Sequence, residues 1–68
     1  MFYVCQISNN LLGAMDECET IEEAVALVLR IVDENGVEIT DEVRAEVDDD
    51  WSYMDTSKEW SVCIGKVG

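Results

Sequence analysis

The chain has 68 residues, which is enough for one domain over residues 1–68 and too few for a second. Its apolar fraction of 49% is typical of a folded globular protein, but 16 acidic residues against four basic ones, without histidine, give a net charge of −12. This balance excludes direct binding to nucleic acid and to anionic membrane surfaces, because phosphate contacts need lysine and arginine.

The N-terminus and the cysteines indicate the compartment. No basic segment accompanies residues 1–4, as a signal peptide would require, and the longest apolar run, residues 24–29, is too short to cross a bilayer. We therefore expect a cytoplasmic protein. Cys5, Cys18 and Cys63 are odd in number and widely spaced, which fits neither a disulfide framework nor a zinc site. We interpret them as small core residues in a reducing compartment.

The first elements form the N-terminal part of a sheet. Residues 2–7 are rich in β-forming side chains and predict a strand, and Ser8, Asn9 and Asn10 predict the turn that follows it. Residues 11–15 leave two alternatives open. They can pair back as a short second strand, or they can form an ordered apolar loop broken at Gly13.

Residues 20–34 predict the clearest helix. Thr20 and Glu23 have the spacing of a capping box, and Asn35-Gly36 supplies a left-handed stop. The apolar arc covers more than half of the circumference, which is wider than a surface helix needs. We therefore expect a helix that is sandwiched between other elements, the less favoured alternative being a dimer interface. The apolar stripe contains Ile21, Val25, Val28 and Val32, with Leu27, Leu29 and Ile31 beside it.

A second helix follows the link over residues 37–39. Thr40 is a good N-cap, and Val43, Val47 and Trp51 recur every four residues as a narrow apolar stripe. Three aspartates, residues 48–50, are unfavourable near a helix C-terminus, so the helix can stop there and residues 51–54 can begin a strand. Residues 55–58 predict a hairpin turn, and residues 60–67 predict the last strand.

This order of elements predicts an α+β fold: a small antiparallel sheet of two to four strands, with two helices packed on one face. We expect no enzyme and no cofactor. The chain has no histidine, no cysteine lies in a basic neighbourhood, and nothing singles out one pair of carboxylates among so many.

A calcium loop is an alternative that the residues leave open. Counted from Asp48, the positions that bind calcium in an EF-hand carry oxygen ligands. However, the sixth position carries Tyr53 where glycine is needed, the eighth carries Asp55, and the residues after Glu59 predict a strand instead of a helix.

The remaining feature is the acidic surface. Residues 33–50 contain nine acidic side chains and one basic one, Arg44. In the second helix, four carboxylates fall within about 100° of arc, and those four residues apart lie about 6 Å apart along the axis. Either this surface only aids solubility, or its repulsion is relieved by a basic partner. The candidate partner-binding residues are Asp33, Glu34, Glu38, Glu42, Glu46, Asp48, Asp49 and Asp50, with Glu42, Glu46, Asp49 and Asp50 as the expected contact face.

Small size, acidity, a compact α+β pattern and the lack of catalytic groups make the chain resemble phage-encoded inhibitors of host defence. These include anti-CRISPR proteins and anti-restriction proteins that mimic DNA. The resemblance implies a basic, nucleic-acid-binding effector complex as the partner, in the host cell cytoplasm. The alternatives are a generic interaction module or small homodimer that uses the apolar face of the first helix, and a calcium-binding module.

Overall fold

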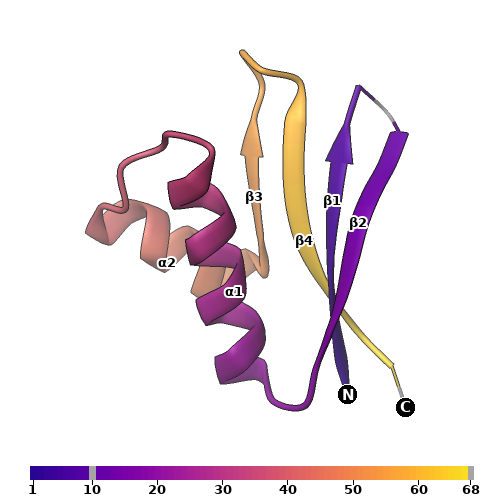
Figure 1. The fold of residues 1–68 in the computed structure, drawn as a ribbon. Helices are drawn as coiled ribbons and strands as arrows, with labels where there is room; N and C mark the ends of the chain where they lie inside the picture. The colour runs from indigo at the N-terminus through magenta and orange to yellow at the C-terminus, as the bar shows by residue number, and fades with distance from the viewer. Residues whose placement is uncertain (10, 68) are drawn as a thin grey trace.

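The computed structural model describes residues 1–9 and 11–67, which form a four-stranded antiparallel sheet and two helices. Both helices pack on the same side of the sheet (Figure 1), so the expected α+β fold is confirmed. The strand order is β2-β1-β4-β3. In chain order the elements are β1 (Phe2–Ser8), β2 (Leu11–Cys18), α1 (Ile21–Glu34), α2 (Asp41–Asp50), β3 (Ser52–Asp55) and β4 (Trp60–Lys66).

The two central strands, β1 and β4, supply the sheet side of the core. Alternate residues of a strand point to opposite faces, and on β4 burial alternates from Trp60 to Ile64, with Trp60, Val62 and Ile64 buried against the helices. Val4 of β1 pairs with Ile64 and is fully buried on the same face. The intervening residues of β1 and β4 point to the other face, which none of the described segments covers.

Residues 11–15, which the sequence left undecided, belong to β2. The strand pairs with β1, and its register slips opposite the stretch between Cys5 and Ile7. Gly13 lies at this slip, where a Cβ atom would come within 3.2 Å of the Gln6 carbonyl oxygen. Asn9 has the left-handed φ of 51° expected of a turn, whereas Asn10, the last residue of the predicted turn, lies outside the described residues.

Helix α1 begins and ends as its sequence predicts. The Thr20 hydroxyl accepts a hydrogen bond from the Glu23 amide at 3.2 Å, and the Glu23 carboxylate accepts one from the Glu19 amide at 3.3 Å. At the other end Gly36 has a φ of 84°, and the Gly36 and Val37 amides donate to carbonyls of the last turn. The side chains of α1 that pack onto the sheet are Ala24, Val28, Ile31 and Val32.

Helix α2 packs on the core through buried Val47 and partly buried Val43, and it is capped by a non-glycine residue in the left-handed region. The Thr40 hydroxyl accepts from the Val43 amide at 3.2 Å, and Val47 is the residue of α2 that is fully buried. The helix ends at Asp50, and Trp51 adopts the left-handed region with a φ of 54°. The Trp51 amide donates to Val47, its carbonyl accepts from the Ile64 amide at 2.8 Å, and its indole stacks edge-on against Phe2 at 5.8 Å. These contacts hold a conformation that costs a non-glycine residue about 1–2 kcal/mol.

The turn between β3 and β4 ties the sheet to α1. The Asp55 carboxylate accepts hydrogen bonds from the Ser57 amide, the Ser57 hydroxyl and the Lys58 amide. Lys58 then reaches the end of α1, where its ammonium donates to the Asn35 carbonyl oxygen at 2.9 Å. A cation therefore lies at the negative end of α1, although no basic residue is present in the last turn of that helix. Among the described residues, no helix combines the length and the apolar character needed to cross a membrane.

Candidate functional site: an acidic helical face

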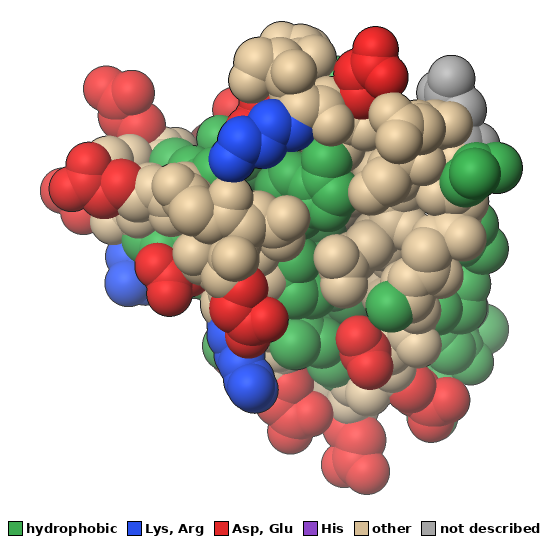
Figure 2. Space-filling model, turned by 45° about the horizontal axis from the view of Figure 1, so that its top comes forward, with side chains coloured by type: hydrophobic (Ala, Val, Ile, Leu, Met, Phe, Trp, Pro, Cys, Tyr) green, Lys and Arg blue, Asp and Glu red, His purple; other side chains and the backbone are tan. Residues whose placement is uncertain are grey.

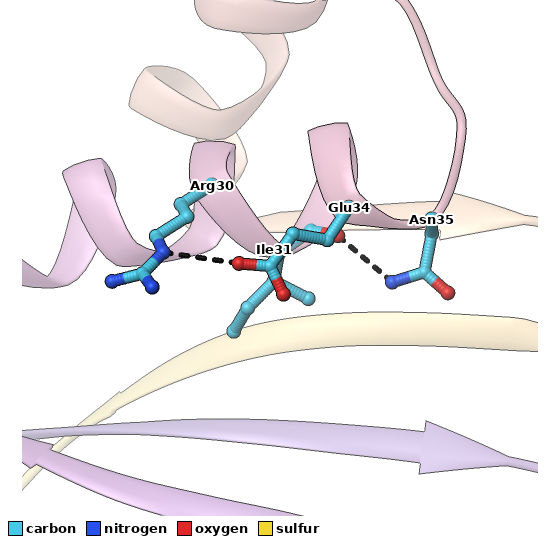
Figure 3. Close-up of polar contacts among 4 residues, drawn as sticks. All are labelled: Arg30, Ile31, Glu34 and Asn35. Carbon is cyan, nitrogen blue, oxygen red and sulfur yellow. Dashed lines mark hydrogen bonds and ion pairs between the residues drawn. The ribbon is translucent and has the colours of Figure 1, made fainter.

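The eight candidate residues are all exposed, and they come from three segments of the chain. Asp33 and Glu34 lie in the last turn of α1, and Glu38 lies in the link between the helices. Glu34 is paired with Arg30 at 3.0 Å (Figure 3), and both side chains are largely in solvent. Such an exposed pair contributes little stability, but it neutralises Glu34. Within residues 1–9 and 11–67 the structure shows no ion pair for the other seven candidates, so Asp33, Glu38 and the candidates on α2 carry the unpaired charge.

Helix α2 presents the acidic array that the sequence predicts. Its ten residues include six acidic side chains and one arginine. Glu42, Glu46, Asp49 and Asp50 are all exposed, whereas Val47 is buried. Glu42 and Asp49 lie on the side of the helix opposite Val47 with Glu46 beside them, and Asp50, three residues after Val47, lies at the edge of this side nearer the core. Figure 2 shows acidic side chains gathered at the left-hand end of the molecule, over α2. We call these four residues the α2 acidic face.

Asp48 lies apart from the α2 acidic face. It lines a groove of about 380 Å³ between the two helices, together with Arg44 of the same helix and Glu22 of α1. The apolar lining of this groove comes from Trp51 and from side chains of α1 that are half-buried or exposed. The residues of α1 are Ile21, Val25, Ala26 and Leu29. The groove therefore has charged side chains of both signs around apolar ones, whereas the α2 acidic face carries negative charge alone.

A second acidic group was not predicted as a site. Five acidic side chains lie in eight positions where β2 runs into α1, and Figure 2 shows acidic side chains along the lower edge of the molecule. We call this the β2–α1 acidic group: Asp16, Glu17, Glu19, Glu22 and Glu23. Its density of acidic residues matches that of α2. This density was the signal in the sequence from which the group could have been predicted. Two of its members act at the positive end of α1, where Glu22 and Glu23 favour the helix.

The last turn of α2 differs from the first turn of α1 in its electrostatics. Asp48, Asp49 and Asp50 lie where the helix dipole is negative, and no basic residue occupies that turn. Each carboxylate in such a position costs about 0.3–1 kcal/mol at low ionic strength. Asp41 and Glu42 lie at the opposite, favourable end of the same helix. The aspartates thus lower the stability of the isolated protein.

The segment considered as a calcium loop adopts other structure. Its first residues, Asp48 and Asp50, belong to α2, whereas Ser52 and Met54 belong to β3. Asp55 is engaged by the hairpin turn, and the Ser57 hydroxyl is the main cause that lowers the pKa of its carboxyl group. Among residues 1–9 and 11–67, no group of three or more metal-binding side chains comes together.

The cysteines differ in their surroundings. Cys18 is buried, and burial is the main cause that raises the pKa of its thiol, with the nearby Glu23 and Asp16 carboxylates adding to it. Cys63 pairs directly with Cys5 across β1 and β4, and burial and the neighbouring thiol raise the pKa of Cys63. Both shifts favour the protonated thiol, which is the poor nucleophile.

Comparison with protein-family models, with curated proteins and with solved structures found no significant match for this chain.

Proposed function

We propose that this protein is an inhibitor that binds the nucleic-acid-binding groove of a bacterial defence effector, a CRISPR or restriction complex, in the host cytoplasm. The α2 acidic face occupies the groove in place of phosphates, and no catalysis is involved. Such a groove is lined by lysine and arginine, whose charges complement the exposed carboxylates of α2.

The observation that carries the proposal is the placement of Asp49 and Asp50 of the α2 acidic face at the C-terminus of α2. Acidic residues that serve only solubility can occupy any exposed position. These two lie next to each other where the helix dipole opposes them, and no cation is present in the last turn. A cationic groove offsets both the unfavourable helix dipole and the repulsion between neighbouring carboxylates. Part of the free energy that these carboxylates cost in folding is then recovered as affinity for the groove.

The test uses purified CRISPR and restriction complexes with fluorescent target DNA, and measures how much of this protein displaces the DNA. The test variant carries Glu42→Gln, Glu46→Gln, Asp49→Asn and Asp50→Asn. We expect it to need at least about tenfold more protein for the same displacement. We expect wild-type inhibition to weaken steeply as salt rises, because surface charges are screened over about 8 Å at physiological ionic strength.

The matched control removes the same number of charges, four, from the β2–α1 acidic group. It carries Asp16→Asn, Glu17→Gln, Glu19→Gln and Glu22→Gln. It should inhibit within about threefold of the wild type. Equal losses in the two variants would assign the effect to net charge and refute the α2 face as the contact. Failure of the wild-type protein to displace DNA from any complex at about 100 µM would refute the inhibitor itself.

A further inference from the structure

Two cysteines lie side by side on the face of the sheet that is turned away from the helices. Cys5 of β1 and Cys63 of β4 are direct partners in the antiparallel ladder between the two central strands. Both thiols are free and half-buried. Val4 and Ile64, which adjoin them in sequence, are buried on the helical side, so alternation places both thiols on the opposite side, which we call the outer face. The fold thus brings together two thiols from opposite ends of the chain.

The third cysteine lies apart from this pair. Cys18 is the last residue of β2, where it pairs with Phe2 and is buried. Phe2 lies two residues before the buried Val4 on the same strand, so alternation places Phe2 and its partner Cys18 on the helical side of the sheet. Of the three pairs that three cysteines allow, the structure therefore brings together one, Cys5 with Cys63.

We propose that Cys5 and Cys63 are a site of reversible oxidation by small-molecule disulfides, and that the bond formed between them clamps the two central strands. In the first step a thiolate of the pair attacks one sulfur of the oxidant, which forms a mixed disulfide and releases one small thiol. The second thiol of the pair then loses its proton and attacks the protein sulfur of the mixed disulfide, which releases the second small thiol. The two cysteines give up two protons and two electrons in total, and the oxidant takes them up as it becomes two thiols.

The ladder sets the distance between the two cysteines. Asn9 and Glu59 continue the register of β1 and β4, and the Asn9 amide donates to the Glu59 carbonyl oxygen at 3.0 Å. Hydrogen-bonded and non-hydrogen-bonded pairs alternate along an antiparallel ladder. Cys5 and Cys63 each lie four residues from this pair, so they also occupy a hydrogen-bonded position, where opposite Cα atoms are about 5.5 Å apart. Disulfides span Cα distances of roughly 4.4–6.8 Å, so the backbone is already within reach of the bond.

The same position makes the bond easy to reduce. Opposite Cβ atoms in a sheet lie about 4.5–5.5 Å apart and are closer in non-hydrogen-bonded pairs. A disulfide needs its Cβ atoms within about 3.5–4.5 Å. Closing the bond between Cys5 and Cys63 therefore draws the ladder away from its relaxed geometry, and strain of this kind makes a disulfide more reducible. We expect a bond that forms under an oxidant and opens again in the glutathione buffer of a cytosol.

Small neighbours leave Cys63 open to an oxidant, although its thiol is not activated. Beside it on the outer face are Ser52 of β3 and Ser61 and Gly65 of β4, and a Cβ atom at Gly65 would meet nothing within 4 Å. Burial, and after it the Cys5 thiol, raise the pKa of Cys63, so attack by Cys63 on the oxidant is slow. Proximity of the two thiols, and not the reactivity of either, therefore selects this pair.

The experiment treats the folded full chain with bis(2-hydroxyethyl) disulfide, an uncharged oxidant that the net charge of −12 does not repel. The remaining thiols are alkylated in denaturant, and the chain is cut after acidic residues, which separates Cys5 from Cys18 at Glu17. Mass spectrometry should then show a monomer that has lost two hydrogen atoms, with Cys5 linked to Cys63 and Cys18 alkylated. A bond to Cys18, mixed disulfides that persist on the wild type, or no reaction would overturn the proposal.

Two variants, with the fold checked by circular dichroism, test whether strand pairing joins the thiols. Cys63→Ser lacks the second thiol, so its oxidation should stop at a mixed disulfide on Cys5. Adding Ser61→Cys to Cys63→Ser returns a thiol to the same face, at a diagonal position roughly 7–8 Å from Cys5 and beyond the reach of a disulfide. We expect the equilibrium constant for its intramolecular bond to be at least about tenfold lower than in the wild type. Equal constants would refute the pairing as the cause.

The oxidised protein should be more stable, and its bond should be reversible. The bond closes a loop over residues 5–63, nearly the whole chain, so we expect the melting temperature to rise by at least about 5 °C on oxidation. We expect the bond to open within hours in about 5 mM reduced and about 0.05 mM oxidised glutathione, which approximates a cytosol. A bond that persists in this mixture would be a permanent structural bond, and an oxidised form that melts lower would not be clamped. Either result would contradict the proposal.

Discussion

The aspartates at the end of α2 should make the protein less stable than it would be without them. We consider Asp49→Asn with Asp50→Asn, which keeps side-chain size and helix propensity nearly constant. Each charge opposes the helix dipole by about 0.3–1 kcal/mol, so the double variant should gain about 1 kcal/mol in free energy of unfolding at low ionic strength. For a domain of this size, that corresponds to a rise of about 4–8 °C in melting temperature. Relief of repulsion with the neighbouring acidic residues acts in the same direction.

The matched control is Asp41→Asn with Glu42→Gln, which removes two charges from the favourable end of the same helix. It gains the same relief of general repulsion but loses the attraction to the dipole. We expect it to be less stable than the C-terminal variant by about 1–2 kcal/mol, measured by thermal and urea unfolding. High salt should reduce this difference, since the Debye length falls to about 3 Å at 1 M. If the two variants are equally stabilised, general repulsion and not the dipole governs α2, and the argument from placement fails.

Two further outcomes follow from the turn between β3 and β4. Lys58→Met should lower the free energy of unfolding in urea by about 0.5–1 kcal/mol, because it removes the hydrogen bond to the Asn35 carbonyl. The control Lys66→Met should cause no measurable loss of stability. Equal losses of stability in the two variants would show that Lys58 does not stabilise the end of α1. Because the folded pKa of Asp55 is lowered, its contribution to stability is present above the usual aspartate pKa and is lost as the pH falls through the folded value. Ser57→Ala should raise that pKa toward 3.8 in an NMR titration, and an unchanged value would contradict the assigned cause.

Local sequence signals were sufficient for the two helices and for the first and last strands of the chain, β1 and β4. The caps at Thr20 and Thr40 and the stop at Gly36 depend on residues within four positions, and the structure places each as expected. The apolar alternation of β4 likewise predicts its buried face. The fate of residues 11–15 depended on pairing with β1, which local propensity does not determine. The slip of register at Gly13 has a similar origin, because the glycine is needed only when the Gln6 carbonyl lies beside it.

The sequence predicted the charge of the candidate site, but not how the structure distributes its residues among different surroundings. Helical spacing placed Glu42, Glu46 and Asp49 on one exposed side, and the buried Val47 fixes that side toward solvent. Helical spacing had already left Asp48 out of the expected contact face. The groove that Asp48 lines required the position of α1, since this groove exists only between the two helices. The neutralisation of Glu34 by Arg30, in contrast, was visible in the sequence as a pair four residues apart.

The placement of the carboxylates bears on whether the acidity serves solubility alone. Acidic side chains that only aid solubility can occupy any exposed position. Asp49 and Asp50 instead lie side by side in the last turn of α2, where the helix dipole opposes them and no basic residue is present. The acidity is therefore concentrated where it costs stability, which is the pattern expected of a surface that a basic partner would neutralise.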